Sequence, residues 1–131
     1  MTRVAFDDNK KAWVDLNGLR NDISIEPDLH CYYYHLPDTD FVLKAFENES
    51  VYGKELGEII TRDGKLVNAI PFFQYPSFCA DHKRYKCRIA WVQGYENDEV
   101  LLVVNCSEVG DLRVRFNLKT MEYSEPNFNV R

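Results

Sequence analysis

The sequence predicts a strand-dominated α+β fold, in which an antiparallel sheet of six or seven strands is accompanied by one or two short helices. Its C-terminal part is expected to be a three-stranded meander over residues 85–118. Apolar and polar residues alternate over 85–92 and 112–118, as is typical of strands with one buried face. Glu99–Cys106, between them, is nearly all apolar, as in a central strand covered on both faces. At 131 residues and 45% hydrophobic side chains, residues 1–131 are expected to form a single domain.

Two segments before the meander are candidate helices. Lys10–Leu16 can be a helix, because Asp8 can cap it and Gly18 can end it, or a strand, because its apolar residues alternate. A second helix would begin at Asn48 or Ser50, although two glycines inside it each cost about 1 kcal/mol. The apolar residues of that helix would be Tyr52, Leu56, Ile59 and Ile60.

Two pairs of strands are also expected there. Leu29–Leu36 and Phe41–Phe46 form one pair, joined by a turn at residues 37–40, and Glu58–Ile70 forms a hairpin around Asp63-Gly64. The first pair contains three consecutive tyrosines at 32–34, which a strand would direct to alternate faces. These rings are either buried on both faces or exposed beside the acidic turn. Residues 70–78 are interpreted as an apolar loop packed on the core.

The net charge of −5 is unevenly distributed along the chain. Residues 1–81 contain 8 Lys and Arg against 14 Asp and Glu, a balance of −6, whereas residues 82–131 contain 8 against 7, a balance of +1. An acidic surface attracts a basic partner. It disfavours nucleic acid, because binding to the phosphate backbone needs a positively charged protein surface. The alternative is that these carboxylates only keep the protein soluble.

The compartment is expected to be the cytoplasm. The longest aliphatic run, Val100–Val104, is far shorter than the ~20 residues that cross a membrane, and the N-terminal residues Met1–Asp8 lack the apolar core of a signal peptide. The cysteines at 31, 79, 87 and 106 are therefore expected to be reduced thiols that pack as small hydrophobes.

Few residue patterns support catalysis, so the chain is predicted not to be an enzyme and to bind no cofactor. Cys79, His82 and Cys87 form the one local grouping of potential metal ligands, but they lack the paired arrangement of a zinc site. No cysteine has a context that would lower its pKa, and the glycines are scattered rather than gathered in a phosphate-binding loop. No metal site is predicted.

The leading hypothesis is a small protein-binding inhibitor. In its general features the chain resembles immunity proteins, which neutralise a cognate bacterial toxin: it is compact, acidic, rich in Tyr and Phe, and without a catalytic motif. The expected mechanism is occlusion of the basic active site of a nuclease-like toxin. The candidate partner-binding residues are Asp22, Glu26, Asp28, Tyr32, Tyr34, Asp38, Asp40, Glu47 and Glu49.

Two other functions fit parts of the sequence. A curved sheet closing over a pocket would make a small-molecule-binding or enzymatic domain, with His82 as a base; the lining candidates are Tyr85, Trp91, Phe72 and Phe116. Nucleic acid could instead bind a basic face of the meander formed by Lys86, Arg88, Arg113 and Arg115. That face is expected to carry no aromatic residue, because the alternation directs Trp91 into the core, and the long basic stems are expected to lie over apolar strand residues.

Overall fold

The computed structural model describes residues 2–48, 50–51, 54–72, 86–107 and 110–124. These residues form two antiparallel sheets, of seven and five strands, and contain no helix. The strand-dominated, antiparallel character of the prediction is confirmed. The single sheet of six or seven strands is wrong, because strands as short as two residues extend the pairing and the chain divides between two sheets.

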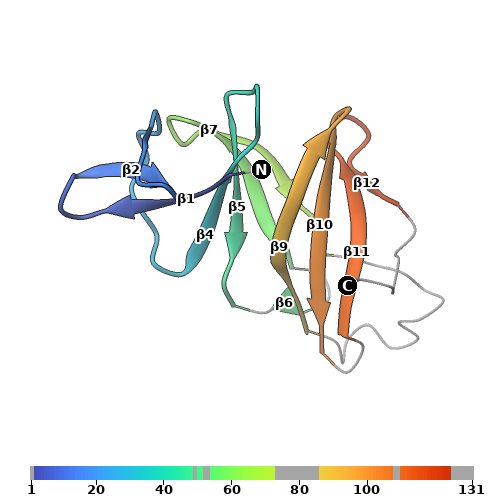
Figure 1. The fold of residues 1–131 in the computed structure, drawn as a ribbon. Helices are drawn as coiled ribbons and strands as arrows, with labels where there is room; N and C mark the ends of the chain where they lie inside the picture. Colours follow the sequence, from blue (N-terminus) through green and yellow to red (C-terminus); the bar gives the residue numbers. More distant parts are fainter. Residues whose placement is uncertain (1, 49, 52–53, 73–85, 108–109, 125–131) are drawn as a thin grey trace.

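The first sheet has the strand order β3-β2-β1-β4-β5-β7-β8. Its strands are β1 (Thr2–Asp7), β2 (Ala12–Asp15), β3 (Arg20–Asn21), β4 (Cys31–His35), β5 (Phe41–Phe46), β7 (Gly57–Thr61) and β8 (Leu66–Ile70). The second sheet has the order β12-β11-β10-β9-β6. Its strands are β6 (Ser50–Val51), β9 (Lys86–Glu96), β10 (Glu99–Cys106), β11 (Gly110–Asn117) and β12 (Glu122–Tyr123). Figure 1 shows the two sheets side by side, with β5 and β9 adjacent.

Neither candidate helix forms over the described residues. Of the two alternatives for Lys10–Leu16, the strand is the one observed, as β2. The Asp7 carboxylate accepts hydrogen bonds from the backbone N–H groups of Asn9 (2.9 Å) and Lys10 (3.1 Å), so this acidic segment closes a hairpin between β1 and β2 instead of capping a helix. Ile59 and Ile60 of the second candidate helix lie in β7. They point to opposite faces, and both faces are buried there, so the apolar pair does not distinguish strand from helix. Tyr52 lies outside the described residues.

Two apolar clusters hold the fold together. The inner cluster lies between the sheets and combines residues of the first sheet, such as Leu43 and Ile59, with Leu102 and Phe116 of the second. The outer cluster covers the opposite face of the first sheet; it consists of Val4, Trp13, Ile23, Tyr33, Val42 and Ile60. The first sheet is therefore covered on both faces, which explains why its strands carry consecutive apolar residues.

Two bulges in β9 change which side chains reach the core. Along the pairing with β10, Ile89 is opposite Val104 and Trp91 is opposite Val103, so Ala90 is an extra, unpaired residue. The extra residue reverses the alternation: Val92 is 1% exposed, whereas Trp91 is 56% exposed. The prediction that Trp91 shares the core face of Cys87 and Ile89 is therefore wrong. Tyr85 and the loop residues 73–78 lie outside the described residues.

The cysteines also differ from expectation. Cys87 and Cys106 are directly opposite each other in β9 and β10, with Cα atoms 4.3 Å apart, and they form a buried disulfide. The expectation of reduced thiols is therefore wrong for this pair, because pairing of the two strands brings the side chains together. Cys31 is free, and Cys79 lies outside the described residues. Over the part of the chain that the structure describes, there is no helix long and apolar enough to span a membrane.

Candidate protein-binding surface

Residues 22–28 cross the outer face of the first sheet and carry three of the predicted acidic residues. The N–H of Ser24 donates to the carbonyl oxygen of Arg62 at 2.8 Å, which ties this segment to the turn between β7 and β8. The indole N–H of Trp13 donates to the carbonyl oxygen of Ile25 at 3.2 Å. Because Ile23 is also buried in the outer cluster, the segment is fixed at several points along its length. The acidic residues of the segment are Asp22, Glu26 and Asp28, all exposed.

The segment lies close against Gly64 in the β7–β8 turn. Gly64 has a φ of +93°, a conformation that side chains rarely adopt. A Cβ at this position would lie 2.8 Å from Cγ2 of Ile25. The Asp63-Gly64 turn predicted from the sequence therefore has a second role, since its glycine leaves room for residues 22–28.

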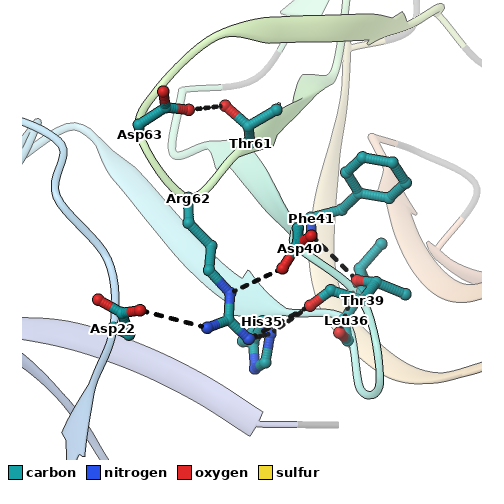
Figure 2. Close-up of polar contacts among 9 residues, drawn as sticks. All are labelled: Asp22, His35, Leu36, Thr39, Asp40, Phe41, Thr61, Arg62 and Asp63. Carbon is teal, nitrogen blue, oxygen red and sulfur yellow. Dashed lines mark hydrogen bonds and ion pairs between the residues drawn. The ribbon is translucent and has the colours of Figure 1, made fainter.

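Arg62 connects three turns at one end of the first sheet (Figure 2). Its Nη1 lies 3.8 Å from Oδ2 of Asp22, and its Nε lies 3.8 Å from Oδ1 of Asp40. Its Nη2 donates to the carbonyl oxygen of Thr39 at 3.3 Å and lies 3.0 Å from Nε2 of His35. Two of the predicted acidic residues, which are far apart in sequence, are thus brought to one guanidinium.

The turn that carries Asp40 is held by its own hydrogen bonds (Figure 2). The hydroxyl of Thr39 donates to the carbonyl oxygen of Leu36 at 2.8 Å and accepts from the N–H of Phe41 at 3.0 Å. The N–H of Arg62 donates to the carbonyl oxygen of Asp40 at 3.1 Å, which joins this turn to the β7–β8 turn. Asp40 and Asp22 are therefore presented on a backbone that is already ordered.

A hollow of about 400 Å³ lies beside residues 22–28 on the same face. Its carboxylates are Glu26, Glu58 and Asp63, and its cation is Lys44, which is opposite Glu58 in the β5–β7 pairing. The hydroxyl of Thr61 donates to the Asp63 carboxylate, and this hydrogen bond lowers the pKa of Asp63. The apolar part of the lining consists of Ile25, Tyr33 and Ile60.

Asp28 and Cys31 lie at the other end of residues 22–28. The N–H of His30 donates to the Asp28 carboxylate at 2.9 Å, and this hydrogen bond lowers the pKa of Asp28. The N–H of Asp28 in turn donates to the hydroxyl of Tyr33 at 3.1 Å. Burial, with the nearby Asp28 charge, raises the pKa of Cys31 to about 11. Cys31 is consequently a neutral thiol near pH 7, which disfavours a nucleophilic role.

These groups lie along residues 22–28 and in the adjacent strand and turns, and together they form an acidic surface. We use that name for the carboxylates of Asp22, Glu26, Asp28, Asp40, Glu58 and Asp63. With Lys44, Arg62 and Lys65, whose Nζ lies 3.8 Å from Oδ2 of Asp63, the six carboxylates give a formal charge of −3. The surface therefore contains half of the acidic excess of residues 1–81.

The predicted tyrosines do not belong to this surface. Tyr34 is 5% exposed and lies in the inner cluster, so its ring is buried and not part of a surface that a partner could contact. Tyr32 packs at the edge of the same cluster, with the guanidinium of Arg3 4.4 Å from its ring centroid. The tyrosine that borders the acidic surface is Tyr33, which is 4% exposed and contributes to the floor of the hollow. Because both faces of β4 are covered, all three rings contribute to packing.

The remaining predicted residues are distributed over the β4–β5 hairpin. Asp38 is exposed beside Asp40 and has a φ of +59°. Glu47 follows the opposite end of β5, a strand of six residues, and so lies roughly 20 Å from Asp40. Its N–H donates to the carbonyl oxygen of His30 at 2.9 Å, which places it near the Asp28 end. Glu49 lies outside the described residues.

Sequence reasoning missed Arg62, Lys44, Glu58 and Asp63. Alternation in β5 could have identified Lys44 as sharing the outer face with Val42. Nothing local indicates that Arg62 meets Asp22, since the contact depends on residues 22–28 crossing the sheet.

The pocket suggested as an alternative does not form from the residues expected to line it. Phe116 is fully buried and Phe72 is 7% exposed, both in the inner cluster, whereas Trp91 lies on the opposite face of its sheet. His82 and Tyr85 lie outside the described residues. Within the described ranges, no group of three or more His, Cys, Asp or Glu side chains could hold a metal ion.

Comparisons with protein-family models, with curated proteins and with solved structures found no match to this chain.

Proposed function

We propose that this protein is a small inhibitor of the immunity type, which binds a basic protein partner through the acidic surface and blocks that partner's active site. The main support for this proposal is that one face of the first sheet brings together carboxylates from three segments: residues 22–28, the turn at 37–40 and the β7–β8 hairpin. Such a surface attracts a basic partner over a distance and orients it on approach.

The ordered backbone under these carboxylates favours tight binding. The segment carrying Glu26 is anchored by hydrogen bonds to the backbone of Arg62 and to the indole of Trp13, and Asp22 and Asp40 each lie 3.8 Å from the guanidinium of Arg62. The backbone therefore loses little conformational entropy when a partner binds, so more of the interaction free energy contributes to affinity.

The lining of the hollow indicates which side chain of the partner it would accept. Its apolar lining of Ile25, Tyr33 and Ile60 suits the aliphatic stem of a lysine or arginine, and Glu26 and Glu58 would accept hydrogen bonds from the cationic end. Enzymes that cleave nucleic acid present such side chains in their active-site clefts, since they bind phosphates. A nuclease-like toxin is therefore the proposed partner.

Binding kinetics test the proposal once a candidate toxin is in hand. A gene directly upstream that encodes a large secreted protein would supply one, as its C-terminal domain. We expect this protein to inhibit that domain stoichiometrically. The double variant Asp22→Lys, Glu26→Lys should slow association at least tenfold and weaken its dependence on salt. Its midpoint of urea unfolding establishes that the fold is retained.

The matched control is the double variant Asp8→Lys, Glu122→Lys, which changes the net charge equally at exposed positions away from the acidic surface. If both double variants slowed association equally, net charge alone would explain the effect, and the assignment of the binding site to the acidic surface would be contradicted. An absence of inhibition by the wild-type protein, with no protein partner recovered from the producing cells, would contradict the function.

A further inference from the structure

The outer face of the second sheet brings an exposed tryptophan together with several cations. The strand register sets Arg88, Asn105 and Asp111 in one row across β9, β10 and β11. The next row on this face consists of Trp91, Val103 and Arg113, and the third of Gly94, Leu101 and Arg115. Successive rows are roughly 7 Å apart along the strands. We call these three rows, with the neighbouring Lys86, the basic face.

The bulge at Ala90 creates this combination. Without the extra residue, Trp91 would point into the inner cluster, and the basic face would lack an aromatic group. With it, Trp91 is 56% exposed, while its cross-strand neighbour Val103 is 4% exposed. The centre of the face is therefore apolar, with the large planar ring of Trp91 exposed at the surface.

The charge of the basic face is opposite to that of the acidic surface. The three rows and Lys86 contain four cations, Lys86, Arg88, Arg113 and Arg115, and one carboxylate, Asp111. The next row, beyond Arg115, contains Glu96 and Glu99 opposite each other. Glu99 lies 4.0 Å from Arg115, whose side chain is still 61% exposed. Asp111 accepts a hydrogen bond from the amide of Asn105 at 2.7 Å. With Glu96 and Glu99 included, the net charge of these seven groups is +1.

The two charged regions are far enough apart to act separately. The basic face and the acidic surface are the outward faces of different sheets, with the inner cluster between them. Face-to-face sheets are about 10 Å apart, and the outward side chains add to that separation. At physiological salt the screening length is about 8 Å, so the acidic surface repels an anion on the basic face only weakly.

We propose that the basic face is a binding site for single-stranded nucleic acid, in which a base stacks on Trp91 and the guanidinium groups of Arg88 and Arg115, in the rows on either side, contact phosphates. An exposed ring between cations suits both parts of a nucleotide, because the base can stack on the ring and the phosphates can contact the cations. An acidic peptide would use the cations but would not need the ring. This departs from the expectation of no nucleic-acid partner, which depended on the acidic net charge of the chain and on Trp91 being in the core. It is independent of the proposed inhibitor function.

The test uses fluorescein-labelled 12-nucleotide oligo(dT) and oligo(U) with the full chain at 50 mM salt. Fluorescence anisotropy should show saturable binding, with a negative slope of log K against log salt. Bound oligonucleotide should also quench tryptophan fluorescence. Trp13 is 2% exposed, so the quenching comes from Trp91.

Variants separate stacking from charge. Trp91→Ala should weaken binding about 5- to 100-fold and abolish the quenching. The double variant Arg88→Gln, Arg115→Gln should reduce the salt slope by about 1.4, which is about 0.7 for each phosphate that is no longer neutralised. Arg20→Gln, an exposed cation on the first sheet, is the matched control and should bind like the wild type.

Three outcomes would overturn the proposal. The first is no binding at 1 mM protein. The second is binding without quenching that Trp91→Ala leaves unchanged. The third is equal or tighter binding of a 12-residue oligoglutamate at the same face, which would assign it to an acidic polypeptide.

Discussion

Replacing Gly64 by alanine tests whether residues 22–28 are packed on the first sheet as the structure describes. Two costs arise at once. A side chain at a positive φ costs about 1–2 kcal/mol, and here φ is +93°. The new methyl would also lie 2.8 Å from Cγ2 of Ile25, and such overpacking typically costs about 1–3 kcal/mol. Because Ile25 is partly exposed and can shift, we expect a total loss of about 2–3 kcal/mol in the free energy of unfolding.

Urea unfolding measures the total, and a double-mutant cycle isolates the contact. In the background of Ile25→Ala the clash is absent while the backbone strain remains, so Gly64→Ala should then cost about 1 kcal/mol less. Hydrogen exchange provides a local readout: the Ser24 amide, which donates to Arg62, should exchange faster in Gly64→Ala.

A loss below about 0.5 kcal/mol, with no coupling to Ile25 and unchanged exchange at Ser24, would refute the reasoning. It would show that residues 22–28 are not held against the β7–β8 turn. The acidic surface would then lack the fixed geometry on which the proposed function depends.

Three further changes test other contacts. Arg62→Met should lower the free energy of unfolding by about 1–3 kcal/mol, because it removes a charge-assisted hydrogen bond and two ion pairs. Arg62→Lys should be destabilised as well, because lysine lacks the planar guanidinium. If Arg62→Lys unfolded in urea like the wild type, the role of the guanidinium would be contradicted. The raised pKa of Cys31 can be measured by alkylation in a Cys79→Ser variant, which removes the other unpaired cysteine of the sequence. Because only the thiolate reacts, the alkylation rate of native Cys31 should rise about tenfold per pH unit up to pH 11. A plateau near pH 9 would contradict the raised pKa. The double variant Cys87→Ala, Cys106→Ala should lose about 3 kcal/mol in the free energy of unfolding, because the disulfide closes a loop with a sequence separation of 19. If the wild-type protein unfolded identically with and without dithiothreitol, the disulfide would be contradicted.

Local patterns predicted a good part of the strand pairing. The β4–β5 and β7–β8 hairpins lie where turn residues separate apolar runs, at 37–40 and at Asp63-Gly64. The predicted helices failed because their signals were equally local but ambiguous: an acidic residue can cap a helix or close a hairpin, as Asp7 does. Local helix and strand propensities alone could not distinguish a capped helix from a hairpin, because the outcome depends on pairing with a neighbouring strand.

The sequence by itself determined that this chain is rich in strands, that its acidic excess lies before residue 82, and where several of its turns occur. The tertiary structure decided which of those acidic residues act together, because the contact between Asp22 and Arg62 exists only when residues 22–28 cross the first sheet. It also decided the faces of the aromatic residues. Tyr34 is buried because a second sheet covers β4, and Trp91 is exposed because pairing with β10 leaves Ala90 as an extra residue. A period of two shows which side chains share a face, but the neighbouring strand and the opposing sheet determine which face is buried.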